Sequence, residues 1–258
     1  MASLHQVSGI ILSRRDHKEV DRWYSAFTRE RGKIEFLARG AHKPLAKLSP
    51  HLESFCEADF LLVDGRHYHT IAGVERRRAF PNIRTDLSRL LLAKNGLHLV
   101  DIGTKQFEAD PFLYKSTLYW LKFLDQAPSI SPERSGFLLA SFALKLLAIT
   151  GYRPELNRCL ACKAPVESKS FRWHALKGGV VCQKCVQADE EQWFASRPMD
   201  DDTLKLIRFA LAEAYPDQLK PHLPGQTLAA FHEAVESLIV SHFPTIPANS
   251  LRGACLVC

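Results

Sequence analysis

Two cysteine pairs in the second half of the chain constrain its fold more than any other feature. Cys159 and Cys162 form one Cys-x-x-Cys pair, and Cys182 and Cys185 form another after nineteen intervening residues. A Cys-x-x-Cys turn aims both sulfurs at one point, and thiolates select zinc over hard cations. We therefore predict a zinc ribbon over residues 157–186, in which two tight turns supply four sulfur ligands to one Zn²⁺ ion per chain.

The predicted metal site is structural, because four cysteines complete a tetrahedron and leave no open position for water or substrate. His174 is an alternative ligand, although the four sulfurs already fill the coordination sphere. A redox disulfide pair is less favoured, since a thioredoxin-type motif occurs singly and opens a helix after a strand. A zinc nuclease or deaminase is disfavoured too: the nearest acid is Glu155, and no His-x-Glu signature accompanies the cysteines. We expect no enzymatic activity.

Length and composition indicate a globular protein with room for two domains and the ribbon. The chain has 258 residues, and 46% of them are hydrophobic. The first residues lack the basic region of a signal peptide, and the apolar stretch at residues 137–149 is too short to span a bilayer. We expect a cytosolic protein with no membrane partner, in a reducing compartment where paired cysteines bind metal more often than they form disulfides.

Positive charge is concentrated in the first third of the chain. The formal net charge is +6, and residues 1–80 hold fourteen Lys and Arg against ten Asp and Glu. The same residues contain six of the eleven histidines. This distribution favours a polyanionic partner for the N-terminal region.

The N-terminal region reads as five short strands, at residues 7–12, 22–28, 33–38, 54–63 and 68–75. Five strands in this length suit a small closed barrel such as an OB-fold, although an SH3-like barrel or an open meander has the same count. Trp23 and Tyr24 are consecutive and therefore point to opposite faces, so that one fills the barrel and the other is available to stack. Cys56, inside an apolar strand, is predicted to be a buried free thiol.

After residue 80 the apolar period changes from two to about 3.6, which predicts helices. We place them at residues 85–107, 112–125, 131–150, 200–215 and 226–243. The predicted fold class is thus α+β and multidomain: an OB-fold barrel over residues 1–80, then a helical bundle over residues 81–258 with the four-cysteine ribbon inserted. Cys255 and Cys258 form a third pair, which we interpret as part of a flexible tail; a zinc half-site shared between two chains is the alternative.

Several local motifs accompany this order of parts. Residues 151–156 read Gly-Tyr-Arg-Pro-Glu-Leu directly before the first cysteine pair, and shorter matches include residues 14–22, 27–33, Gly40 with Lys43-Pro44, and Gly65-Arg66. On these motifs the chain resembles the RecO family of bacterial recombination mediators. The likeness covers roughly residues 5–190, and the remaining residues match only in being helical.

The resemblance implies an N-terminal OB-fold that binds single-stranded and duplex DNA and anneals complementary strands. It implies a partner clamp protein of the RecR type, a role in loading recombinase onto gaps coated by single-strand-binding protein, no catalytic residues, and association with the nucleoid. Family members also offer a docking surface for the acidic tail of single-strand-binding protein. Here residues 140–145 read Ala-Ser-Phe-Ala-Leu-Lys, where relatives often carry Arg-Arg-Phe-Glu-Leu.

DNA binding without sequence preference needs cations along the phosphates and aromatic faces for the bases. The basic loop at residues 39–47 is expected to be exposed, although His42 and Leu45 stand where the family often has further basic residues. The alternative function is a zinc-containing scaffold whose helical domain binds protein partners with little direct DNA binding. The candidate DNA-binding residues are Arg14, Arg15, Arg22, Lys33, Arg39, Lys43 and Lys47.

Overall fold

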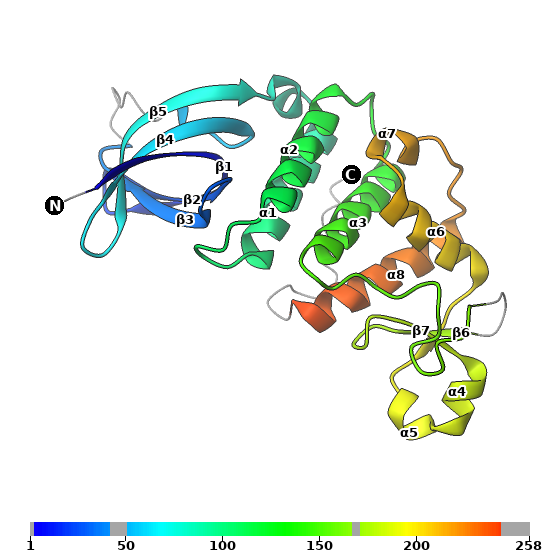
Figure 1. The fold of residues 1–258 in the computed structure, drawn as a ribbon. Helices are drawn as coiled ribbons and strands as arrows, with labels where there is room; N and C mark the ends of the chain where they lie inside the picture. Colours follow the sequence, from blue (N-terminus) through cyan, green and yellow to red (C-terminus); the bar gives the residue numbers. More distant parts are fainter. Residues whose placement is uncertain (1–2, 42–50, 167–170, 244–258) are drawn as a thin grey trace. The chain divides into compact units, whose positions relative to one another are not determined.

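The computed structural model describes residues 3–41, 51–166 and 171–243 (Figure 1). It divides into two compact units, Met1–Pro128 and Ser129–Cys258, and each is described by itself. The first unit holds the barrel together with two helices. The predicted division into domains at residues 1–80 and 81–258 stays a prediction.

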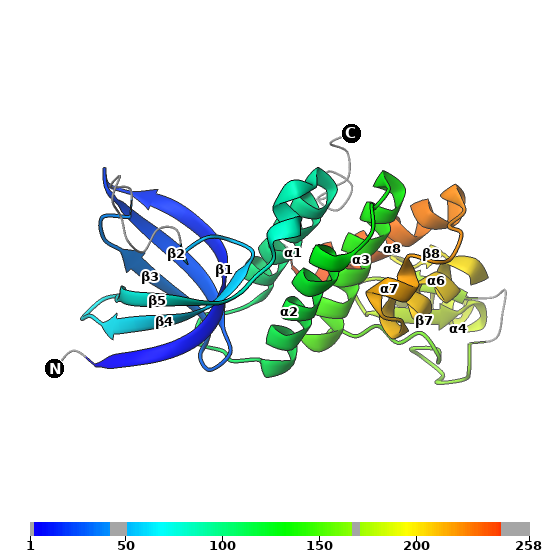
Figure 2. The same ribbon diagram turned by 90° about the horizontal axis from the view of Figure 1, so that it is seen from above.

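The barrel consists of β1 (Leu4–His17), β2 (Asp21–Thr28), β3 (Gly32–Ala38), β4 (Cys56–Asp64) and β5 (His69–Ala79). These strands close in the order β1-β2-β3-β5-β4, with β3 and β5 parallel and the other pairs antiparallel (Figure 2). A five-stranded Greek-key barrel of this kind is an OB-fold. The closed order excludes the open meander, and the five predicted strands are confirmed.

Two strands are longer than their apolar pattern indicated. The second half of β1, residues 13–17, pairs with β2 but carries mostly exposed polar side chains. The end of β5 likewise pairs with β4 while its side chains face solvent. Hydrophobic alternation marks only the part of a strand that covers the core, and therefore it understates strands that extend beyond the core.

Aromatic side chains fill the barrel. Tyr24 and Phe36 stack with ring centroids 5.7 Å apart, and Phe36 lies 5.4 Å from Phe60. All three are fully buried. Cys56 is also buried as a free thiol, as predicted, and burial raises the pKa of this thiol.

The first unit continues with a short 3-10 helix η2 (Pro81–Thr85), α1 (Leu87–Gly103) and α2 (Pro111–Gln126). The side chain of Asp86 accepts a hydrogen bond from the Arg89 amide and so caps α1, which explains why the helix begins there. Gly96 lets the two helices approach closely, because a Cβ atom at this position would lie 2.4 Å from Nε1 of Trp120 on α2.

The second unit is built around α3 (Pro132–Ile149), α6 (Asp201–Ala212), α7 (Tyr215–Gln218) and α8 (Gly225–His242). Most side chains of α3 are buried, in agreement with its apolar sequence. The helix predicted at residues 200–215 ends earlier, and α7 follows as a separate turn that the sequence did not indicate. Among the described residues, no helix has the length and apolar character needed to cross a lipid bilayer.

Candidate functional site

A small three-stranded sheet lies beside the four cysteines and includes one of them, Cys182. Its strands are β6 (Phe171–His174), β7 (Gly179–Cys182) and β8 (Arg197–Pro198), in the order β7-β6-β8. The helices α4 (Gln183–Ala188) and α5 (Glu190–Trp193) follow β7. β6 lies within the predicted ribbon at residues 157–186, while β8 extends the sheet beyond it.

The two cysteine pairs lie on different kinds of backbone. Cys159 and Cys162 occupy a tight turn, closed by a hydrogen bond of 3.0 Å from the Lys163 amide to the Cys159 carbonyl. Cys182 instead ends β7, and Cys185 lies in the first turn of α4. The prediction of two tight turns is therefore correct for the first pair and wrong for the second, where a strand leads directly into a helix.

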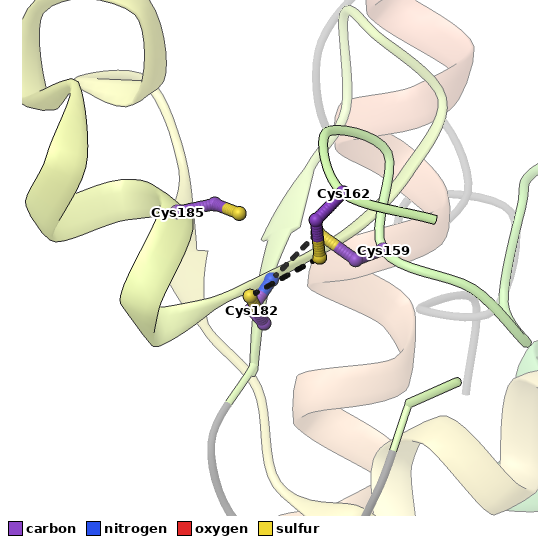
Figure 3. Close-up of side chains that lie close together, drawn as sticks. All are labelled: Cys159, Cys162, Cys182 and Cys185. Atoms are coloured by element: carbon purple, nitrogen blue, oxygen red, sulfur yellow. Dashed lines mark hydrogen bonds between the residues drawn. The ribbon is translucent and has the colours of Figure 1, made fainter. Parts of the chain in front are cut away.

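The four sulfur atoms converge on one point (Figure 3). Every pair of them lies within 4.8 Å, and the sulfurs of Cys162 and Cys182 are 3.9 Å apart. A tetrahedral zinc site with Zn–S bonds of ~2.3 Å requires sulfurs about 3.8 Å apart. The cluster thus offers a donor set suited to a metal ion that prefers thiolates.

The local electrostatics favour ionised sulfur at Cys159. Burial opposes ionisation, but the amides of Cys182, Cys162 and Ala161 donate to this sulfur and lower its pKa to about 6. Cys182 N lies 3.3 Å from Cys159 Sγ. The pKa of Cys185 is raised, first by its hydrogen bond with Cys182, because neighbouring sulfurs disfavour further negative charge without a cation.

His174, the alternative ligand, lies outside the group of four sulfurs. It is buried, its Nδ1 accepts a hydrogen bond of 3.2 Å from the Lys177 amide, and its ring packs edge-on against Trp193 at 5.6 Å. Burial lowers its pKa, so that the neutral ring is favoured. His174 therefore has a packing role in the ribbon.

On the barrel, strand register determines which predicted DNA-binding residues share a face. Arg15 pairs across the sheet with Trp23, and Trp23 pairs with Leu37. Cross-strand partners lie on the same face of a sheet, and consecutive residues lie on opposite faces. Trp23 is therefore on the outer face, while Tyr24 points into the barrel. This confirms that the two aromatic residues face opposite ways.

An aromatic and basic patch surrounds Trp23 on this outer face. Its members are Arg15, His17, Trp23 and Tyr68. The guanidinium carbon of Arg15 lies 5.6 Å from the Trp23 ring centroid. The rings of Tyr68 and His17 meet Trp23 edge-on, at 5.4 Å and 6.0 Å. Tyr68 comes from the loop between β4 and β5, which with the outer face of β2 and β3 is where OB-folds bind oligonucleotides.

The remaining predicted cations are dispersed. Arg14 pairs with Tyr24 and so lies on the opposite face from Arg15. Arg22 lies on the same face as Arg14 and donates a hydrogen bond to Asp16 at 2.8 Å. This hydrogen bond raises the pKa of Arg22. Lys33 is largely buried and donates to the Asp101 carbonyl at 2.5 Å.

The rest of the predicted basic loop is described only in part. Arg39 is exposed at the end of β3. Lys43 and Lys47 lie outside the described residues, as do His42, Leu45, Cys255 and Cys258. The sequence prediction missed Tyr68 and His17, and the signal that points to Tyr68 is its position after the Asp64-Gly65 turn.

The third helix offers no exposed counterpart of the family's basic docking residues. Residues 140–144 are buried. Lys145 directs its ammonium group to the carbonyl oxygens of Leu211 and Glu213, at 2.9 Å each. At the position where the sequence departs from the family pattern, Lys145 therefore caps the C-terminal end of α6.

Two family models together match nearly the whole chain. Residues 1–80 match the family model for the recombination protein O N terminal, and residues 84–247 match that for its C terminal. The DNA repair protein RecO of Alkaliphilus metalliredigens is 28% identical over 97% of this chain and 98% of its own length. The DNA repair protein RecO of Bacillus subtilis is 30% identical over 80% of this chain and 76% of its own.

Proposed function

The chain belongs to the RecO family of DNA repair proteins, which are recombination mediators rather than enzymes. From this we propose that it binds and anneals single-stranded DNA. We propose further that it helps load recombinase onto gaps coated by single-strand-binding protein. The aromatic and basic patch around Trp23 carries the proposal. Single-stranded DNA is bound without sequence preference where aromatic rings accept bases beside cations that contact phosphates. Arg15, Trp23 and Tyr68 supply both components at the usual ligand face of an OB-fold.

The four cysteines have a structural role in this proposal. Cys159, Cys162, Cys182 and Cys185 hold one zinc ion whose coordination sphere they fill. The ion links the turn at residues 159–162 to the junction of β7 and α4, and the ribbon in turn is attached to the helices. Trp173 on β6 donates to Ser237 of α8 at 3.2 Å, and Arg208 of α6 donates to the Leu156 carbonyl.

The central test is salt-dependent binding of a labelled oligonucleotide. Wild-type affinity should fall as salt rises, because phosphate contacts release counterions. Trp23→Ala should lose about 1–3 kcal/mol of binding free energy, the usual contribution of one stacked base. Trp193→Ala is not a suitable control, since Trp193 is buried in the ribbon. Phe194→Ala is a better control, because Phe194 is 80% exposed and belongs to the second unit, Ser129–Cys258.

Two outcomes would contradict the proposal. Binding no better than millimolar at low salt would remove its central step, and equal losses in Trp23→Ala and Phe194→Ala would show that the patch is not the binding surface. Annealing of complementary oligonucleotides coated by single-strand-binding protein, with and without a RecR-type clamp protein, then tests the mediator activity and both proposed protein partners.

One observation favours the alternative function, a scaffold with little DNA contact. Three of the predicted cations are ion-paired with carboxylates: Arg15 with Glu35 at 3.3 Å, Arg22 with Asp16 and Lys33 with Asp101. Paired cations contribute less to phosphate binding unless the pair opens. The scaffold would retain partner-protein binding while oligonucleotide affinity stayed independent of salt.

A further inference from the structure

A second group of metal-binding side chains lies at one end of the barrel. His5 comes from β1, Asp64 from the end of β4 and His69 from the start of β5. One ligand atom from each lies within 4.8 Å of the other two. Asp64 Oδ1 is 2.7 Å from Nδ1 of His69 and 3.4 Å from Nδ1 of His5.

Strand register explains why these residues meet. His5 pairs with Leu62, and Asp64 pairs with His69. Leu62 is fully buried in the barrel, and Asp64 follows it two positions later on the same face. The three polar side chains therefore continue inward-facing rows of β1, β4 and β5 to the point where the apolar core ends.

His5 is poorly satisfied in this position. Both of its ring nitrogens are buried, and neither forms a hydrogen bond with any of the residues that the structure describes; Nδ1 has only the 3.4 Å contact with Asp64. A buried polar group left without a hydrogen bond destabilises the fold. An apolar side chain would avoid this cost, so that a histidine here indicates a further ligand for the ring.

The geometry points to a divalent transition-metal ion, and we propose that His5, Asp64 and His69 bind one ion of the zinc, cobalt or nickel type. Imidazole nitrogens favour these metals, whereas Mg²⁺ and Ca²⁺ are bound mainly by oxygen. Three protein ligands leave at least one position for water. This site is separate from the four cysteines and does not depend on DNA binding.

The surroundings of Asp64 support this assignment. Its other oxygen, Oδ2, accepts a hydrogen bond from the Ser3 hydroxyl, which directs Oδ1 toward the two histidines. Hydrogen-bonded carboxylates of this kind commonly orient metal ligands. Binding requires a small adjustment, because two ligands at ~2.1 Å from a tetrahedral ion lie about 3.4 Å apart, further than the present distance from Asp64 to His69.

The ion would hold together the two ends of the loop that carries Tyr68. Asp64 precedes the loop at residues 65–68 and His69 follows it, while His5 belongs to the neighbouring strand. Occupancy would therefore restrict this loop, whose Tyr68 packs against Trp23. This consequence rests on the proposed function, whereas the metal site does not.

The test uses untagged protein of residues 1–258, first loaded with one equivalent of zinc for the four cysteines. Titration with Co²⁺, followed by calorimetry and visible absorption, should reveal one further equivalent without a thiolate-to-cobalt charge-transfer band. His69→Gln and Asp64→Asn should each weaken this binding at least about tenfold, the smallest loss usual for outer-shell changes. His67→Gln, an exposed histidine in the same loop, is the matched control and should bind as wild type does.

A measurement on the wild-type protein makes the test independent of variant folding. Paramagnetic Co²⁺ should broaden the ring signals of His5 and His69 before those of His67. Absence of a further equivalent, or equal loss in His67→Gln and His69→Gln, would overturn the proposal and leave the three residues as a polar end to the barrel. Oligonucleotide binding by wild-type protein with no added Co²⁺ tests the proposed function separately.

Discussion

The barrel encloses a continuous apolar interior, whereas the core cluster beside the ribbon's cysteines is small. Tyr24, Phe36 and Phe60 pack against one another inside the barrel. Beside the cysteines, Val181 and Trp193 form a small buried core cluster with Cys159. With the proposed zinc ion, the difference illustrates two ways of stabilising a small sheet: side-chain burial in the barrel and metal chelation in the ribbon.

Removal of the metal should have the largest effect and should separate the two regions. A structural zinc site contributes on the order of 10 kcal/mol to local folding. We expect a chelator, or Cys159→Ser, to unfold the ribbon and leave the barrel folded. Hydrogen exchange should show lost protection at residues 155–198 only.

Cys56→Ser is the control for this comparison, because Cys56 is a buried thiol of the barrel. It should retain one zinc per chain. If Cys159→Ser also retained full zinc, the four-cysteine assignment would be wrong.

A cavity in the barrel should destabilise the barrel and leave the ribbon folded. Phe36→Ala should lower the free energy of unfolding by about 3–5 kcal/mol, because it removes a fully buried aromatic ring. Zinc content should not change. Urea unfolding measures the loss, and Phe112→Ala, at a position 76% exposed, should change stability by less than about 0.5 kcal/mol.

Loss of Tyr68 should affect function without affecting either fold. Tyr68→Ala should reduce affinity for single-stranded DNA by about 1–3 kcal/mol, or roughly 5- to 150-fold, if its ring stacks on a base beside Trp23. Fluorescence anisotropy with a labelled oligonucleotide provides the measurement. Unchanged affinity would restrict the interface to Trp23 and the cations.

Arg15→Ala should have the smallest effect, seen mainly in the dependence on salt. Loss of one phosphate contact on single-stranded DNA reduces the slope of log K against log salt by about 0.7. Arg29→Ala, an exposed arginine in the turn between β2 and β3, should leave the slope unchanged. A similar change in both variants would indicate general charge attraction rather than a defined patch.

The comparison also explains how much the sequence could predict. The ribbon was identified from residue spacing because its four cysteines are close along the chain. The barrel strands and main helices were recognised from apolar periodicity. The small elements α4, α5, α7 and β8 were missed, since short segments with few apolar residues have no clear period.

The candidate DNA interface was only partly predictable. The sequence grouped Arg14, Arg15, Arg22 and Lys33 by charge, but register places Arg14 and Arg22 on one face and Arg15 on the other. Lys33 was counted as a phosphate contact, yet it is engaged with Asp101 of α1. Charge is read directly from a sequence, while the pairing of a charge depends on residues far along the chain.

By itself, the sequence determined the four-cysteine cluster, the five strands and the family, because each depends on local spacing or on motifs. Only the tertiary structure decided which cations share a face, that Tyr68 joins Trp23, and that His5 meets Asp64 and His69. Those residues lie up to about sixty positions apart. Their proximity follows from barrel closure and strand register, which no local pattern encodes.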